Sequence, residues 1–117
     1  MHEMSIALAL VEQLQRIAAE QRAVRIVEVE VRCGVLRQVV PEALQLAFSA
    51  ASADTPAAGA VLRISEEDLV AKCRPCGTQF AARMDDYRCP TCRQADVELV
   101  GGQDIVLKSV VCDTVPP

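Results

Sequence analysis

Four of the six cysteines form two closely spaced pairs, Cys73-x2-Cys76 and Cys89-x2-Cys92, separated by twelve residues. Two residues between cysteines let one tight turn direct both sulfurs at the same ion. Two such turns together supply four thiolates in a tetrahedron, which is the donor set of a closed, structural Zn(II) site. A rubredoxin-like iron site or a pair of redox dithiols would use the same residues, but a redox CxxC needs only one pair, placed at a helix start. We therefore predict that these four cysteines bind structural zinc.

The residues that follow the two pairs differ. Gly77 follows the first pair, where a residue with positive φ is commonly needed to close the turn. Arg93 occupies the matching position after the second pair, so the sequence predicts that this turn closes without the freedom of glycine. The remaining cysteines, Cys33 and Cys112, lie in apolar, strand-like segments, and we interpret them as small core residues.

The only histidine of the chain is His2. A side chain of this size in second place is expected to block removal of the initiator methionine, so that Met1 keeps a free α-amine. That amine, the His2 amide nitrogen and the His2 imidazole can chelate one metal through fused rings, and the Glu3 amide nitrogen can complete a planar set. Planar nitrogen coordination favours Ni(II) or Cu(II) over zinc. The alternative is a solvated N-terminus that binds metal only weakly.

Two helices are expected to position these residues. Ser5 is a candidate N-cap for the first helix, which would begin directly after it. The second helix begins at Pro41, a residue suited to a first helical turn. Apolar residues recur at spacings of three and four along the first helix, and a shorter apolar set marks the second. These residues are Ile6, Ala7, Leu10, Val11, Leu14, Ile17 and Ala18, and then Leu44, Leu46, Ala47 and Phe48.

Three strands are expected around and between the helices, at residues 24–33, 61–67 and 104–112. In the first strand an alternating pattern places valines and Cys33 on one face and charged residues on the other. In the third, one face is expected to carry Ile105, Leu107 and Val111. The valines are Val27, Val29 and Val31, and the charged residues are Glu28, Glu30 and Arg32.

These elements predict an α+β fold in which two helices pack on a three-stranded sheet, with an inserted zinc-ribbon module. We assign residues 1–69 and 96–117 to the α+β domain and residues 70–95 to the zinc ribbon, since that segment cannot bury a core of its own. The 117 residues are 51% apolar but only 3% aromatic, so the core must be aliphatic.

Composition and charge exclude several functions. The formal net charge of −4 disfavours a whole-chain clamp on nucleic acid. No apolar run is long enough for a membrane span, and no basic segment precedes the first apolar residues as in a signal peptide. We expect a cytoplasmic protein, where six cysteines indicate metal binding rather than disulfides. An enzyme is disfavoured because no histidine remains beyond His2 and no phosphate-binding glycine loop is present.

The sequence resembles the HypA/HybF family of hydrogenase-maturation nickel chaperones along nearly its whole length. The residues that carry the resemblance are Met1-His2-Glu3-Met4-Ser5, Gly34-Val35-Leu36 before Pro41-Glu42-Ala43-Leu44, and the ribbon from Cys73-Arg-Pro-Cys76-Gly77 to Cys89-Pro-Thr-Cys92. The family usually has glycine where this chain has Arg93. This departure concerns the geometry of the ribbon and leaves the ligands unchanged.

The resemblance implies that Met1, His2 and Glu3 bind Ni(II) as transported cargo, while Cys73, Cys76, Cys89 and Cys92 hold structural Zn(II). It further implies delivery of nickel to the large subunit of [NiFe]-hydrogenase together with a nickel-handling GTPase, and in some organisms service to urease maturation. The alternative is a zinc-ribbon module that binds protein or nucleic acid. Residues 70–95 of this chain carry five basic and two acidic residues. A zinc ion with four thiolates adds negative charge, so the ribbon as a whole would keep only a small positive charge.

Overall fold

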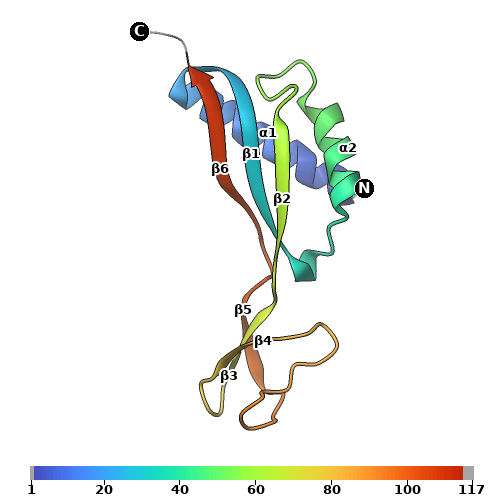
Figure 1. The fold of residues 1–117 in the computed structure, drawn as a ribbon, viewed down its shortest axis with the longest axis vertical. Coiled ribbons are helices and arrows are strands. Elements are labelled where there is room, and N and C mark those ends of the chain that lie inside the picture. Colours follow the sequence, from blue (N-terminus) through green and yellow to red (C-terminus); the bar gives the residue numbers. More distant parts are fainter. Residues whose placement is uncertain (1, 115–117) are drawn as a thin grey trace. The chain divides into compact units, whose positions relative to one another are not determined.

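The computed structural model describes residues 2–114, which divide into two compact units (Figure 1). The first unit contains the chain up to Val31, Val39–Ile64 and the chain from Leu107 onward; the second contains Arg32–Gln38 and Ser65–Val106. The elements in chain order are α1 (His2–Gln21), β1 (Ala23–Gly34), η1 (Val35–Arg37), α2 (Pro41–Ser52), β2 (Val61–Glu67), β3 (Val70–Cys73), β4 (Gln79–Ala81), β5 (Val97–Gly101) and β6 (Ile105–Thr114). The strands form two sheets, with the orders β2-β1-β6 and β4-β3-β5. The predicted α+β class, with two helices, a three-stranded sheet and a separate cysteine-bearing module, is confirmed.

The two helices pack against each other, and α1 crosses behind the strands of the first unit in Figure 1. Six of the seven apolar residues predicted to face the core from α1 are buried, and the seventh, Ile17, is half-buried. Of the apolar residues that mark α2, Leu46 does not face the core, since it is 75% exposed. At 3.6 residues per turn, Leu44, Ala47 and Phe48 share one face, whereas Leu46 lies nearly opposite Leu44.

The first helix begins earlier than the sequence predicted. It starts at His2, and Ser5 is a residue of its first turn rather than its N-cap. The Ser5 hydroxyl donates a hydrogen bond of 2.9 Å back to the His2 carbonyl oxygen. His2 and Glu3 therefore belong to the helix and do not form a tail in front of it.

The sheet β2-β1-β6 has one buried and one charged face. In β1 the buried residues are Ile26, Val29, Val31, Cys33 and Gly34, whereas Val27, predicted on the inward face, is half-buried. In β6 the prediction that Val111 shares a face with Ile105 and Leu107 is wrong: Val111 is 51% exposed, and its neighbours Val110 and Cys112 are half-buried instead. The alternation of half-buried and exposed residues along β6 shifts by one residue at Lys108 and Ser109, which are both exposed. Such a shift is typical of a local irregularity in a strand.

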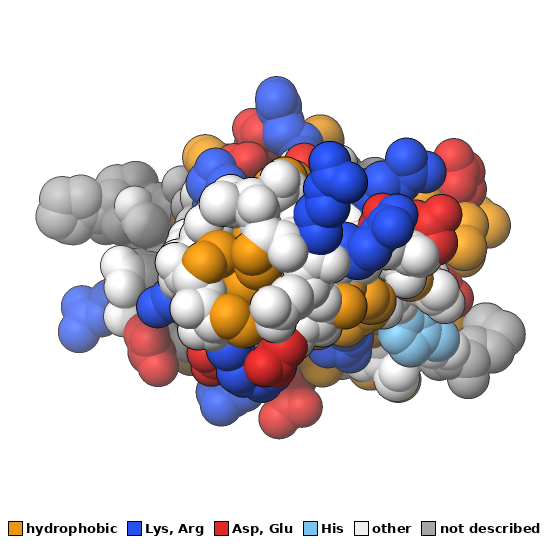
Figure 2. Space-filling model, turned by 90° about the horizontal axis from the view of Figure 1, so that it is seen from below, with side chains coloured by type: hydrophobic (Ala, Val, Ile, Leu, Met, Phe, Trp, Pro, Cys, Tyr) orange, Lys and Arg blue, Asp and Glu red, His pale blue; other side chains and the backbone are white. Residues whose placement is uncertain are grey.

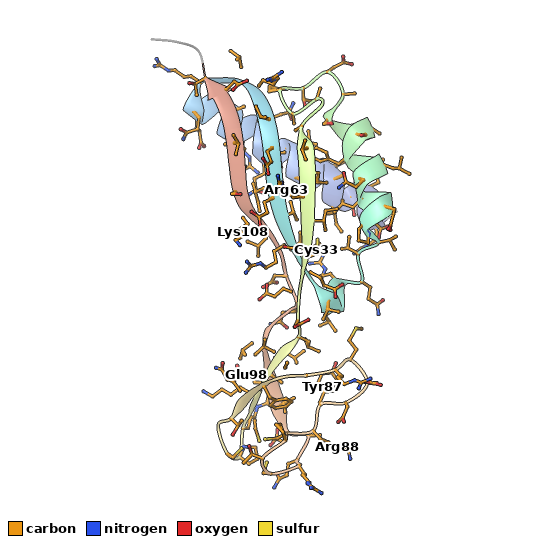
Figure 3. All side chains as sticks on the ribbon, viewed as in Figure 1. Cys33, Arg63, Tyr87, Arg88, Glu98 and Lys108 are labelled. Carbon is orange, nitrogen blue, oxygen red and sulfur yellow. The ribbon has the colours of Figure 1, made fainter. Side chains whose placement is uncertain are left out.

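Charged side chains of β1 pair with those of its two neighbours. Glu28 pairs with Arg63 of β2, and Glu30 contacts Lys108 at 3.7 Å and Ser109 at 3.3 Å. Figure 3 shows Arg63 and Lys108 on the strands at either side of β1. Such exposed pairs contribute only about 0–1 kcal/mol each, so burial on the other face stabilises this sheet.

The small sheet β4-β3-β5 was not predicted as strands. It is antiparallel, and its central residue Ala71 pairs with Phe80 on one side and Leu99 on the other. The second unit also contains a close backbone approach of Gly34 to Gly102. A Cβ added to Gly34 would clash with the Gly102 carbonyl group, and the Leu36 N–H donates to the Gly102 oxygen at 3.0 Å. Within residues 2–114, neither helix combines the length and apolarity needed to cross a membrane.

Candidate metal centres

The four predicted ligand cysteines lie together in the second unit. Cys73 ends β3, Cys76 lies in the turn that follows, and Cys89 and Cys92 lie between β4 and β5. All four Sγ atoms are within 4.8 Å of one another; Cys73 is 3.3 Å from Cys92, and Cys76 is 3.6 Å from Cys89. Four sulfurs about 2.3 Å from one zinc ion would be about 3.8 Å apart. The cluster therefore fits a tetrahedral metal site with thiolate ligands.

Both turns of the cluster have the same backbone geometry. The Gly77 N–H donates to the Cys73 oxygen at 2.7 Å, and the Arg93 N–H donates to the Cys89 oxygen at the same distance. Gly77 has φ +76°, and Arg93 has φ +63°. Arg93 therefore adopts the left-handed conformation that glycine adopts in the first turn, and the second turn closes in this conformation without the freedom of glycine.

Replacement of Arg93 by glycine is expected to stabilise the cluster. A non-glycine residue in the left-handed region costs about 1–2 kcal/mol, and the greater freedom of glycine in the unfolded chain cancels part of the gain. The Arg93→Gly variant should therefore gain about 0.5–1 kcal/mol in the free energy of unfolding of the second unit. Chemical denaturation of the metal-loaded protein measures this gain, with Gln94→Gly as the control. A destabilised Arg93→Gly variant would show that the arginine side chain makes a contribution larger than the backbone strain.

The four thiols differ in their tendency to ionise. The hydroxyl and the backbone amide of Thr78 lower the pKa of Cys76 to about 6. The Cys76 amide favours the Cys73 thiolate, but burial and the three neighbouring sulfurs together raise the pKa of Cys73 to about 12. Amide hydrogen bonds from Cys92 and Thr91 lower the pKa of Cys89. A metal ion that binds all four thiolates would therefore have to displace protons from the cluster.

The basic residues around the cluster are largely paired with carboxylates. Arg88 donates two hydrogen bonds to Asp86 at 3.0 and 3.1 Å and lowers the pKa of that carboxyl to about 2. Arg83 pairs with Asp85 at 3.3 Å, and Arg74 pairs with Asp96 at 2.8 Å. Arg88 and Tyr87 lie on the loop between β4 and β5 in Figure 3, and Figure 2 shows acidic side chains among the basic ones at this end. This local neutralisation disfavours nucleic-acid binding by the ribbon.

The predicted nickel residues lie at the start of α1 in the first unit, apart from Met1, which is outside the described residues. His2 is exposed, and its Nδ1 atom is 3.4 Å from Glu3 Oε2. The same Glu3 oxygen accepts a hydrogen bond of 3.2 Å from the Val40 N–H. This bond is the main reason that the pKa of Glu3 is lowered. The Glu3 carboxylate thus connects the first turn of α1 to Val40, the N-cap residue of α2.

Val40 and Thr78 adjoin the predicted sites but were not among the residues predicted from the sequence. Val40 contributes only its backbone amide and is 37 residues from Glu3, so no side-chain pattern could reveal it. Thr78 had a local signal, since a hydroxyl two residues beyond a ligand cysteine can reach its sulfur. These two residues fix the environment of Glu3 and Cys76.

The family model for HypA, described as hydrogenase/urease nickel incorporation metallochaperone, matches residues 1–112. The chain belongs to the HypA family. A hydrogenase maturation factor HypA from Archaeoglobus fulgidus is 41% identical over 113 residues, which is 97% of this chain and 99% of the relative. Another, from Pelodictyon phaeoclathratiforme, is 37% identical over 113 residues and 97% of both chains.

The fold is also shared with a solved HypA structure. The solution structure of the nickel metallochaperone HypA from Helicobacter pylori is similar with a TM-score of 0.74 at 23% identity, and covers 98% of this chain and 100% of its own. HypA membership confirms the predicted function, a nickel metallochaperone of hydrogenase maturation, and the expectation that the chain is not an enzyme.

Proposed function

We propose that this HypA protein carries Ni(II) on Met1, His2 and Glu3 and holds structural Zn(II) on Cys73, Cys76, Cys89 and Cys92. The observation that supports the nickel site best is the start of α1 at His2. The first amide N–H groups of a helix have no intrahelical acceptor, so the His2 and Glu3 amides can bind a metal without loss of a helical hydrogen bond. The exposed imidazole adjoins these amides.

Nickel binding would require two changes at this terminus. The α-amine and the amides bind metal only after losing protons, so the nickel affinity should rise with pH. The Nδ1 atom of His2, which closes the fused chelate ring with the His2 amide nitrogen, would exchange its contact with Glu3 for the metal. Because the Glu3 carboxylate is already held by Val40, it can stay in place and offset the positive charge that a cation meets at a helix N-terminus.

A terminal, exposed site also suits transfer. Ligands of an acceptor can reach a metal at the chain end and replace its nitrogen donors stepwise, whereas a closed four-thiolate shell is suited to structural stability. We therefore assign nickel transport to the N-terminus and a structural role to the zinc ribbon of residues 70–95. Residues 1–69 and 96–117 form the proposed nickel domain. When bound, zinc would cross-link the two turns of the ribbon.

The proposed setting is the cytoplasm, without attachment to a membrane or to nucleic acid. The proposed partners are a nickel-handling maturation GTPase and the large subunit of a [NiFe]-hydrogenase, with urease maturation proteins as further candidates. This sequence has no phosphate-binding glycine loop, so nucleotide hydrolysis must come from the partner. Calorimetric titration of the untagged protein with Ni(II), after mass spectrometry has verified Met1, tests the proposal. One strong nickel site per chain with unchanged zinc content is the expected result.

Glu3→Gln tests the role of the carboxylate. Glutamine keeps an acceptor for the Val40 N–H and keeps the backbone nitrogen, but it loses the charge that offsets the helix terminus and the cation. We expect nickel binding to persist and to weaken by about 1 kcal/mol, or about fivefold. Glu12→Gln, the same change on the exposed face of α1, should leave the nickel affinity unchanged. Complete loss of binding in Glu3→Gln would show instead that the carboxylate is itself a ligand.

A further inference from the structure

The four residues of the cysteine cluster differ in their exposure to solvent. Cys73 and Cys89 are fully buried, Cys92 is half-buried, and Cys76 is exposed. A reagent in solution therefore meets the cluster at Cys76. This asymmetry follows from the positions of the residues, because Cys73 lies at the end of β3, whereas Cys76 lies in the exposed turn beyond it.

Besides the cluster sulfurs, Cys76 Sγ adjoins the Thr78 hydroxyl, which modulates its reactivity. The Thr78 hydroxyl oxygen is 3.3 Å from Cys76 Sγ. When Cys76 is a thiolate, as it would be with zinc bound, the sulfur can only accept, so the hydroxyl donates. A hydrogen bond to an anionic sulfur withdraws electron density from it and makes it a weaker nucleophile. Thr78 therefore partly protects the sulfur that the fold leaves accessible.

We propose that Cys76 is the modification site of the cluster, where hydroperoxides and soft electrophiles react first, and that its oxidation produces a Cys76–Cys89 disulfide. The Cys76 thiolate attacks one oxygen of hydrogen peroxide, forming an S–O bond while the O–O bond breaks and hydroxide leaves. The Cys89 thiolate, 3.6 Å away, then attacks Cys76 Sγ and forms the disulfide while a second hydroxide leaves. Two thiolates lose two electrons in all, and the peroxide, taking up two protons, becomes two molecules of water.

The consequence is loss of the structural metal. A disulfide removes two of the four thiolate donors, and the remaining pair cannot close a tetrahedral shell. The protein would thus release zinc under peroxide stress and regain its site when the disulfide is reduced. This inference rests on the proposed zinc site.

The full-length, zinc-loaded protein is first assayed for zinc and then exposed to hydrogen peroxide, and tandem mass spectrometry locates the oxidised cysteines. We expect a Cys76–Cys89 disulfide that appears at the same rate as zinc is released to a chromogenic chelator. Cys112 is followed separately because it lies outside the cluster. A first disulfide within one turn, Cys73–Cys76 or Cys89–Cys92, or oxidation that begins at Cys92, would overturn the inference. Protein that holds no zinc at the outset would instead contradict the proposed zinc site.

Thr78→Val removes the hydroxyl with little change in shape and avoids removing a metal ligand. Peroxide-driven zinc release should become about three- to tenfold faster, because the exposed thiolate loses a charge-assisted hydrogen bond. Thr91→Val is the matched control in the other turn, where the threonine contributes its backbone amide rather than its hydroxyl, and it should keep the parent rate. Equal rates in both variants and the parent would overturn the role of Thr78.

Discussion

His2→Ala should abolish specific Ni(II) binding and leave the zinc content unchanged. The chain has one imidazole, so a nitrogen-rich nickel site has only one plausible centre. Loss of a residue that hydrogen-bonds to a metal ligand typically lowers the metal affinity by about 10–100-fold. Loss of a ligand itself, here the imidazole of a fused chelate, should therefore lower the nickel affinity by more than about 100-fold. The fold should survive, because the His2 side chain is exposed.

Calorimetric titration of untagged His2→Ala with Ni(II) measures this loss, and circular dichroism verifies the helix content. Glu12→Ala serves as the control, since Glu12 is exposed on the same helix and is not among the proposed ligands. Undiminished one-to-one nickel binding in His2→Ala would remove the imidazole from the site.

Cys73→Ser should release zinc and unfold the second unit. Cys73 is fully buried, so a serine hydroxyl in its place would be a weaker ligand in a site closed to water. Structural zinc supplies about 10–16 kcal/mol to the folding of zinc-finger peptides, far more than a sheet as small as β4-β3-β5 can replace. The first unit should survive at least in part, because its aliphatic core of α1, α2 and β1 is separate.

Zinc analysis and two-dimensional NMR of Cys73→Ser test this expectation, with Cys112→Ser as the control outside the cluster. The control should keep one zinc per chain and the parent spectrum. Retention of one tightly bound zinc in Cys73→Ser would refute the four-thiolate assignment, while retained nickel binding would agree with separate metal sites.

The sequence predicted the features that depend on local spacing. The two CxxC pairs identified the cluster because each turn is short enough for two sulfurs to converge, and the 3.6-residue period identified the buried face of α1. Departures from these patterns have equally local causes. Leu46 is apolar but lies on the outer face of α2, and one shift in the alternation of β6 leaves Val111 exposed.

Other features depend on contacts between distant parts of the chain. No pattern in residues 2–5 could show that the Val40 amide holds the Glu3 carboxylate, because the donor is a backbone group. The start of α1 at His2 was hidden by Ser5, which has the chemistry of an N-cap but lies inside the first turn. Arg93 adopts a left-handed conformation because the turn that brings Cys89 and Cys92 together requires it, whatever residue stands there.

The most direct test of the N-terminal nickel site is calorimetric titration of Ni(II) into protein extended by one glycine before Met1, beside the parent chain. The extension keeps His2 and all four cluster cysteines but converts the α-amine of Met1 into an amide and displaces the chelate rings. We expect one strong nickel site in the parent, near-complete loss of that site in the extended protein, and equal zinc content in both. Equal nickel affinity in the two proteins would contradict the N-terminal site.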